Sequence, residues 1–218
     1  MSLCLYSISS PQISNNKLVA DEIAKQSGAT VYVPDLFNGD PISPKDFQLK
    51  KHTDDSDPQP LEEAFKNFGA WLDKGHKPDS SDPIFKKVLA EVGRKGPVVT
   101  SGACYGGRLS ANAAQQPNGI VKGAIMNHPA LLEKGEADKV QVPVLLNMSE
   151  TDVIFTDEIK QDWLDVLKKK NLLDSGSKTY KGAVHGHTCR PDLTKPEIKA
   201  AYEQSLQASA EFIKKIFA

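Results

Sequence analysis

The sequence predicts an α/β fold with a mostly parallel central sheet and helices on both of its faces. Short apolar runs rich in β-branched and aromatic residues alternate along the chain with longer segments whose apolar residues recur at helical spacing. Strands that alternate with helices form parallel sheets, because each connection has to cross back to the starting end of the sheet. Right-handed crossovers then place helices on both faces.

The first half of the chain begins with a strand and a helix. Residues 3–8 form a short apolar run suited to a buried strand, and residues 15–27 carry apolar side chains on one helical face. The β-branched and aromatic run 30–33 predicts the second strand. Helical spacing predicts a helix over 61–72. A further helix is expected to begin at the Asp-Pro pair 82–83, where an N-cap residue precedes a proline.

The second half of the chain continues the alternation. Turns with glycine or polar residues separate its apolar runs from its helical patterns. One helix is rich in small residues, one follows Thr156 as its cap, and the last begins at a capping-box pattern over 194–197. Strands are expected at 97–100, 123–126, 142–148 and 177–180, and helices at 108–115, 159–167 and 198–216.

Length and charge limit the domain organisation and the partners. The 218 residues are expected to form one domain, 1–218, in which 38–82 is a loop and helix excursion near the mouth of the site. The 27 Lys and Arg residues nearly balance the 28 Asp and Glu residues, and the resulting net charge of −1 argues against a nucleic-acid partner. No apolar run approaches the ~18 residues of a membrane span, so no membrane partner is expected.

Other features predict a cytoplasmic protein that is a monomer or a weak dimer. The N-terminus lacks the basic and long apolar segments of a signal peptide. The chain has three cysteines, too few for a disulfide framework at this length, which favours a reducing compartment. The fold is self-contained and the sequence has no evident apolar surface patch, so a monomer is the default expectation.

Several chemically capable residues occur at or just after expected strand ends. In parallel α/β sheets, functional sites form beyond the carboxyl ends of the strands. This rule selects four residues as candidates for a functional site: Cys104, His128, Asp152 and His185.

Cys104 lies in the pattern Gly102-x-Cys104-x-Gly106, between an expected strand and an expected helix. Glycines on either side leave room for a sharp turn with a strained backbone at the cysteine. The turn places the thiol at a helix N-terminus, which favours the thiolate, and directs the backbone N–H of Tyr105 toward a developing oxyanion. Taken alone, the pattern fits equally well a glycine-rich turn around a buried, inert cysteine.

Asp152 and His185 complete a candidate catalytic triad. A thiol nucleophile needs a base that holds its proton and later delivers it to the leaving group, and His185 suits this role. A carboxylate that fixes the histidine tautomer is supplied by Asp152. The chain order of nucleophile, acid and histidine is that of α/β-hydrolases. Each residue taken singly also fits an ordinary loop position, whereas position, order and spacing together favour the triad.

Five motifs connect the sequence with a known family. They lie at 31–40 (VYVPDLFNGD), 102–107 (GACYGG), 127–129 (NHP), 152–155 (DVIF) and 185–190 (HGHTCR). From about residue 15 to the C-terminus, the chain resembles the dienelactone hydrolase, or carboxymethylenebutenolidase-like, family, and most closely its fungal and animal branch. The resemblance implies an α/β-hydrolase fold and an esterase or lactonase with a cysteine nucleophile, a thioester acyl-enzyme and no cofactor or metal.

The resemblance also implies roles for single residues. The family's nucleophile, acid and histidine base match the three triad residues one by one. Arg190 matches the arginine that follows the histidine, and we expect it to meet a carboxylate of a small ester or lactone substrate. His128 and His187, the latter in place of the usual phenylalanine, are placed with it as substrate-binding candidates, although packing alone also explains both.

The N-terminal region departs from the family pattern. Bacterial members carry a glutamate after the first central strand that pairs with the resting thiol, whereas 7–11 of this chain holds no acidic residue. A second substrate-binding arginine of those enzymes is replaced by the Asn-Gly pair 38–39, and both changes argue against dienelactone itself as the substrate. We expect a backbone N–H at Ile8 or Ser9 to complete the oxyanion hole, and the N-terminal edge strands to be trimmed.

Three alternatives remain beside the hydrolase. The main one is a degenerate hydrolase scaffold that serves as a non-catalytic or weakly active binding protein, because the first loop is altered. A glutamine amidotransferase would carry a glutamate where this chain has His187. A zinc site built from Cys104, His185, His187 and Cys189 is disfavoured, because the histidines have a loop spacing and Cys104 comes with no second ligand nearby.

Overall fold

The computed structural model describes residues 3–7, 14–43, 46 and 61–218, and for 3–7 it describes the backbone alone. Six strands form the centre of the fold. They are β1 (Leu3–Ser7), β2 (Thr30–Tyr32), β3 (Val98–Ala103), β4 (Val121–Asn127), β5 (Val144–Thr151) and β6 (Lys178–Val184).

The helices connect these strands in the order that the sequence predicts. A π-helical turn, η1 (Leu72–His76), joins two of them, and a short 3₁₀ turn, η2 (Glu136–Lys139), precedes β5. The α-helices are α1 (Ser14–Ser27), α2 (Leu61–Trp71), α3 (Pro78–Gly93), α4 (Tyr105–Gln115), α5 (Asp157–Lys169) and α6 (Pro196–Phe217).

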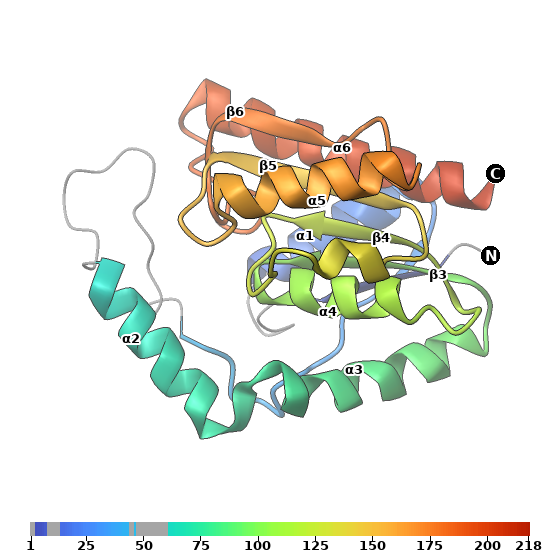
Figure 1. The fold of residues 1–218 in the computed structure, drawn as a ribbon, viewed down its shortest axis with the longest axis horizontal. Helices are drawn as coiled ribbons and strands as arrows, with labels where there is room; N and C mark the ends of the chain where they lie inside the picture. The colour runs from blue at the N-terminus through green and yellow to red at the C-terminus, as the bar shows by residue number, and fades with distance from the viewer. Residues whose placement is uncertain (1–2, 8–13, 44–45, 47–60) are drawn as a thin grey trace.

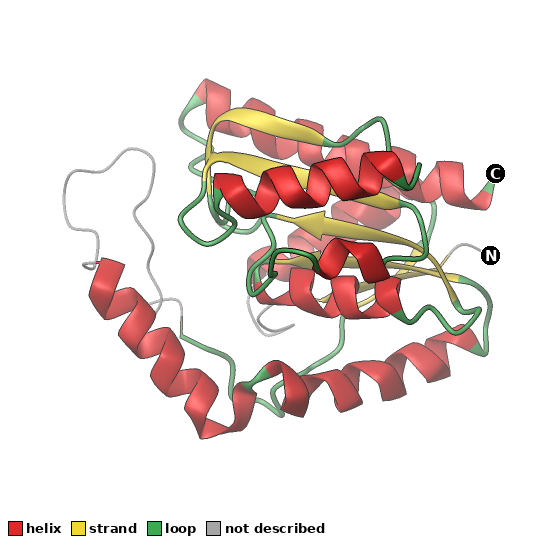
Figure 2. Ribbon diagram, in the orientation of Figure 1, coloured by secondary structure: helices red, strands yellow, loops and turns green. Residues whose placement is uncertain are grey.

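The sheet has the strand order β2-β1-β3-β4-β5-β6, and each neighbouring pair is parallel. From β1 the chain runs out to the edge strand β2 and then returns to β3 on the other side, so the direction of winding reverses between β1 and β3. Figures 1 and 2 show the helices in layers on both sides of the strands. The predicted α/β class with a parallel sheet is confirmed.

Alternate side chains of each central strand enter two different cores. Val98 and Leu146 face a core completed by α3, α4 and α5, whereas their neighbours Val99 and Leu145 face α1 and α6. All four side chains are fully buried. A strand that is covered on both faces needs apolar residues at consecutive positions, which explains the continuous apolar runs in the sequence.

The helix expected at 82–83 begins earlier in the structure. Pro78 takes the first position of α3, and Asp82 and Pro83 lie in its second turn. The fixed φ of proline suits the start of a helix, whereas within the second turn it removes one main-chain hydrogen bond. Asp82 therefore caps no helix end, and instead it pairs with Lys86 (2.6 Å) and accepts a hydrogen bond from Asn112 (3.2 Å).

The strand ends lie along one edge of the sheet. The register pairs Ala103 with Asn127 at the ends of β3 and β4, and Thr151 with Val184 at the ends of β5 and β6. The next residue after each of these strands is one of the four candidates from the sequence: Cys104, His128, Asp152 and His185. Figure 1 shows α2 projecting away from the sheet and α3 running along the outside of the α4 layer.

Candidate active site

Cys104 occupies the sharp turn between β3 and α4. Its backbone has φ 53° and ψ −116°, which a residue with a side chain rarely adopts. A Cβ atom at Gly102 would lie 1.9 Å from the carbonyl oxygen of Gly106, so the chain can approach itself this closely only at a glycine. The Cys104 N–H donates to the carbonyl of Asn127 at 3.1 Å and fixes the turn to β4. The strained turn that the glycine pattern predicts is present.

A second close approach joins this turn to the loop after β4. A Cβ atom at Gly107 would lie 2.6 Å from Cβ of Pro129, and the Ala130 N–H donates to the carbonyl of Cys104 at 2.9 Å. His128, which precedes the proline, is therefore attached to the same rigid turn as the thiol.

Asp152 and His185 form a buried pair. Nδ1 of His185 lies 2.9 Å from Oδ1 and 3.0 Å from Oδ2 of Asp152. Oδ1 also accepts hydrogen bonds from the N–H groups of Ile154 and Phe155, each at 2.9 Å. Burial alone raises the pKa of Asp152, but the hydrogen bond and charge of His185 and these two N–H groups hold the pKa below its ordinary value. The carboxylate is thus ionised and orients the imidazole.

Cys104 and His185 shift each other's pKa. Burial alone raises the pKa of the Cys104 thiol, but His185, Arg190 and the backbone N–H of Tyr105 lower it below its ordinary value. Burial alone lowers the pKa of His185, but Cys104 and Asp152 raise it to about 9. Nε2 of His185 makes no well-aligned hydrogen bond with any described residue, so the two groups interact here chiefly as neighbouring charges. This arrangement favours a thiolate beside an imidazolium.

His128 and His187 lie behind His185 and are buried. The ring centroids of His128 and His185 are 4.9 Å apart, and those of His128 and His187 are 5.2 Å apart. Nδ1 of His187 lies 3.1 Å from the hydroxyl of Ser149. Such burial favours support of the triad over direct contact with a substrate. Within the described residues, no three His, Cys, Asp or Glu side chains are grouped to hold a metal ion.

The remaining candidates differ in how the structure places them. Arg190 is exposed, and its guanidinium lies against the backbone of Gly186 in the loop that carries His185. Tyr105 begins α4, so its backbone N–H has no partner within the helix and is directed at the sulfur of Cys104. Ile8 and Ser9 lie outside the described residues, and their place in an oxyanion hole stays a prediction.

The side chain of Tyr105 has a structural role that the sequence pattern did not predict. Its hydroxyl donates to the carbonyl of His76 at 2.7 Å and lies 2.7 Å from the hydroxyl of Ser81. Its ring packs edge-on against Phe37 and Trp71, and the indole of Trp71 stacks on His76 at 4.5 Å. The tyrosine after the nucleophile thereby anchors the excursion to the turn. The signal in the sequence that could have indicated this role is an aromatic residue inside a glycine-rich turn.

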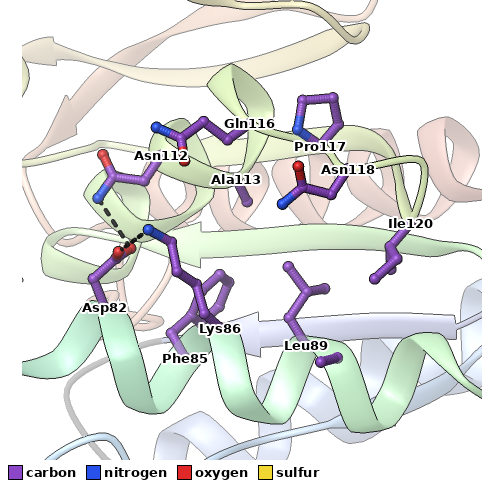
Figure 3. Close-up of a pocket in the computed structure, with 11 residues that line it drawn as sticks. Asp82, Phe85, Lys86, Leu89, Asn112, Ala113, Gln116, Pro117, Asn118 and Ile120 are labelled. Atoms are coloured by element: carbon purple, nitrogen blue, oxygen red, sulfur yellow. Dashed lines mark hydrogen bonds and ion pairs between the residues drawn. The ribbon is translucent and has the colours of Figure 1, made fainter.

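A cavity of about 130 Å³ lies elsewhere, between α3 and α4. Figure 3 shows Phe85 and Leu89 on its apolar side, with Asp82, Lys86 and Asn112 linked at one end. No residue of the candidate triad lines this cavity. The triad and the cavity are therefore separate features of the fold.

Comparison with protein-family models adds the decisive observation. The model of the dienelactone hydrolase family matches residues 8–217. The chain belongs to the dienelactone hydrolase family. Membership in this family identifies the chain as a hydrolase that acts on ester bonds. No helix in the part of the chain that the structure describes is long and apolar enough to cross a membrane.

Related proteins agree with this assignment. The chain is 28% identical over 194 residues to the hydrolase pyvD of Aspergillus violaceofuscus, covering 88% of this chain and 71% of the relative. It is 24% identical to dienlactone hydrolase 1 of Gibberella moniliformis, covering 91% and 72%. The fold is similar to that of a dienelactone hydrolase-like promiscuous phosphotriesterase, P91, from metagenomic libraries (TM-score 0.63, 14% identity, 98% of this chain and 85% of the other). It is also similar to carboxyl esterase 2 of Tuber melanosporum (TM-score 0.61, 12% identity, 100% and 79%).

Proposed function

We propose that this dienelactone hydrolase family member is a cysteine hydrolase of esters or lactones in which Cys104 is the nucleophile, His185 the acid–base group and Asp152 the orienting acid. The observation that carries the proposal is the thiol on its strained turn beside a buried, carboxylate-bound imidazole. A structural cysteine has no need of an imidazole whose charge lowers its pKa. The same geometry disfavours a degenerate scaffold without catalysis.

Acylation would begin from the thiolate. The sulfur of Cys104 attacks the carbonyl carbon of the ester, the C=O π electrons move to oxygen, and the tetrahedral oxyanion accepts a hydrogen bond from the N–H of Tyr105. When the intermediate collapses, the C–O bond to the alcohol breaks. The imidazolium of His185 gives its proton to the departing oxygen, and a thioester remains on Cys104.

Deacylation would reverse these roles with water. His185, now neutral, takes a proton from a water molecule as its oxygen attacks the thioester carbonyl. Collapse of the second oxyanion breaks the C–S bond, releases the carboxylic acid and restores the thiolate and the imidazolium. In a lactone the alcohol stays attached to the acid, so a single ring-opened hydroxy acid leaves.

The substrate class follows from the charge near the thiol. Arg190 is exposed and lies close enough to Cys104 to lower the pKa of the thiol, so we place it where it can also meet a carboxylate of the substrate. A small ester or lactone with a carboxylate group fits this site, and no cofactor takes part in the proposed reaction. A cytoplasmic location and a monomer or weak dimer remain predictions.

The proposal is tested with an activated ester. Rapid mixing with p-nitrophenyl acetate should give a burst of p-nitrophenol and a mass increase of one acetyl group on Cys104, and Cys104→Ala should abolish both. Iodoacetamide should label Cys104 before Cys4 or Cys189. The matched control is Cys189→Ala, which removes the other cysteine that the structure describes. Undiminished turnover in Cys104→Ala, or prior labelling of either other cysteine, contradicts the proposal. A chain with no turnover at all supports the non-catalytic scaffold.

A further inference from the structure

His128 makes two contacts with the segment that carries His185. Its ring meets the ring of His185 edge to face, with the centroids 4.9 Å apart and the planes at 67°. Its Nε2 lies 2.7 Å from the hydroxyl of Thr188, three residues beyond His185 in the same loop. His128 and Thr188 are both buried, and they come from segments sixty residues apart.

Packing alone does not account for a histidine at this position. The backbone of His128 has φ 34°, in the left-handed region where a residue with a side chain is strained. Nδ1 of its buried ring has no hydrogen-bond partner of good geometry among the described residues, which an apolar side chain of similar size would avoid. The strained backbone would be present with any side chain, but the unpartnered nitrogen is a cost of the imidazole itself, and the contact of Nε2 with Thr188 offsets it in a way that an apolar group cannot.

The outer end of the loop after β6 is held by this ring and by Asn15, whose Nδ2 donates to the carbonyl of Cys189 at 3.1 Å. Within the loop, the N–H groups of Cys189 and Arg190 both donate to the carbonyl of Gly186, which has φ 97°. Asp152 binds only the Nδ1 edge of His185. The contact between His128 and Thr188 ties the other end of the turn to the residue after β4, and the ring of His185 packs against the same imidazole.

We propose that His128 and Thr188 form a latch that positions His185: His128 packs against the catalytic imidazole and holds its loop through the Thr188 hydroxyl, so that Nε2 stays turned toward Cys104. The inference rests on the proposed function and deepens it, because it assigns positioning residues to the same triad. Neither latch residue touches the substrate or the reacting atoms.

The charge of His128 agrees with this role. Burial, and then the electrostatic effect of His185, His187 and Arg190, hold the pKa of His128 well below its ordinary value, so the ring is neutral. The other titratable group against it is the thiol of Cys189, whose sulfur lies 3.6 Å from Nε2. His185 itself faces Cys104, Asp152 and His128. A neutral ring supports the imidazolium without repelling it, which a cation in the same place would do.

The test uses the full chain with three latch variants and one matched control. Thr188→Val removes the hydroxyl at constant shape, Thr188→Ser keeps it, and His128→Gln keeps a polar group without the ring. Thr100→Val is the control, because Thr100 is also fully buried and its hydroxyl has no partner among the described residues. Each protein is first compared by its thermal unfolding midpoint.

Two readouts separate positioning from stability. The first is the rate at which iodoacetamide alkylates Cys104, followed by mass spectrometry of the Cys104 peptide against pH. Thr188→Val and His128→Gln should move its midpoint upward by about one pH unit, because an imidazolium held out of place no longer stabilises the thiolate. The second is ester turnover, in which kcat should fall about 10- to 100-fold with little change in KM. Thr188→Ser and Thr100→Val should stay within about twofold of the wild type on both readouts.

A double variant completes the test. If the two residues form one latch, Thr188→Val with His128→Gln should lose no more than the worse single variant. Additive losses, or an alkylation midpoint unchanged in either folded variant, would overturn the inference. If Thr188→Val does not fold, His128→Gln and Thr188→Ser still decide it. Failure of the proposed function itself would appear differently, as turnover in the wild type that survives Cys104→Ala, while the alkylation profile would still test the latch.

Discussion

Nδ1 of His185 lies 2.9 Å from Oδ1 of Asp152, in a pair whose side chains are almost fully shielded from solvent. The carboxylate is itself fixed by the N–H groups of Ile154 and Phe155, at the start of the loop after β5. Its position therefore does not depend on the histidine. The histidine is oriented by an anchor that the backbone has already placed, and this leaves Nε2 for the thiol.

Asp152→Asn should lower kcat by about 10³- to 10⁴-fold while preserving the fold, because the amide no longer stabilises the imidazolium and favours the wrong tautomer. The expected change is measured as steady-state turnover of an ester. Asp165→Asn is the control, since Asp165 accepts a hydrogen bond from the exposed Gln161 on α5 and lies outside the candidate triad. Equal losses of kcat in the two variants would show that the carboxylate of Asp152 has no specific role in catalysis.

Acylation should follow two pKa values. Its rate should rise as pH passes the lowered pKa of Cys104, and with an ethyl ester it should fall again near pH 9, where His185 loses the proton that the poor leaving group needs. A p-nitrophenyl ester should lack the falling limb, because its leaving group needs no proton. Identical profiles for the two esters would contradict the role of His185 as the acid.

The raised pKa of His185 also affects the stability of the fold. The folded-state pKa of His185, about 9, lies above its ordinary value of 6.5, so protonation of His185 stabilises the fold fully below pH 6.5. This contribution is lost as pH rises through about 9. Urea unfolding of the wild type and of His185→Gln at several pH values should therefore differ most at the acidic end of this window and least above it. A difference in stability that grows toward high pH would contradict the predicted direction of this pH dependence.

Gly102→Ala should disrupt the turn that carries the thiol. The new Cβ would lie 1.9 Å from a backbone oxygen, which no side-chain rotation relieves, and we expect a loss of about 2–4 kcal/mol in the free energy of unfolding together with most of the activity. Gly69→Ala is the matched control, because the α2 position has open space around it. There the substitution should be neutral or stabilising by up to about 1 kcal/mol. A folded, active Gly102→Ala protein would refute the close approach.

Tyr105→Phe should weaken the attachment of the excursion to the site. Burial raises the pKa of Tyr105 to about 12, so its hydroxyl stays protonated and donates to the carbonyl of His76. Its removal leaves that buried carbonyl and Ser81 without this partner, at a cost of about 1–3 kcal/mol in the free energy of unfolding. Urea denaturation measures the loss, and Ser81→Ala should cost less, because the bond to His76 remains. The reverse order would show that Ser81 is the main partner.

The sequence predicts most of the strands because a short apolar run marks them, whereas β6 (KTYKGAV) has no continuous apolar run and extends four residues beyond the expected 177–180. Cys104, His128 and Asp152 are predicted at strand ends because each follows such a run. The start of α3 is missed because both Pro78 and Pro83 are compatible with a helix start, and local preference does not choose between them. The contact of His128 with Thr188 is set by the register of β4 against β5 and β6, which no local pattern contains.

The aligned strand ends carry the three candidate catalytic residues, and the loops that follow surround them. Cys104, Asp152 and His185 are each the first residue after a hydrogen-bonded strand, so the ladder of the sheet sets the spacing of their backbones. Loops that make no contact with the three side chains or with the latch can then change in length or sequence without moving these groups. In directed evolution, the segment between β2 and α3 is therefore the natural place to introduce sequence changes, and the reacting groups are left unchanged.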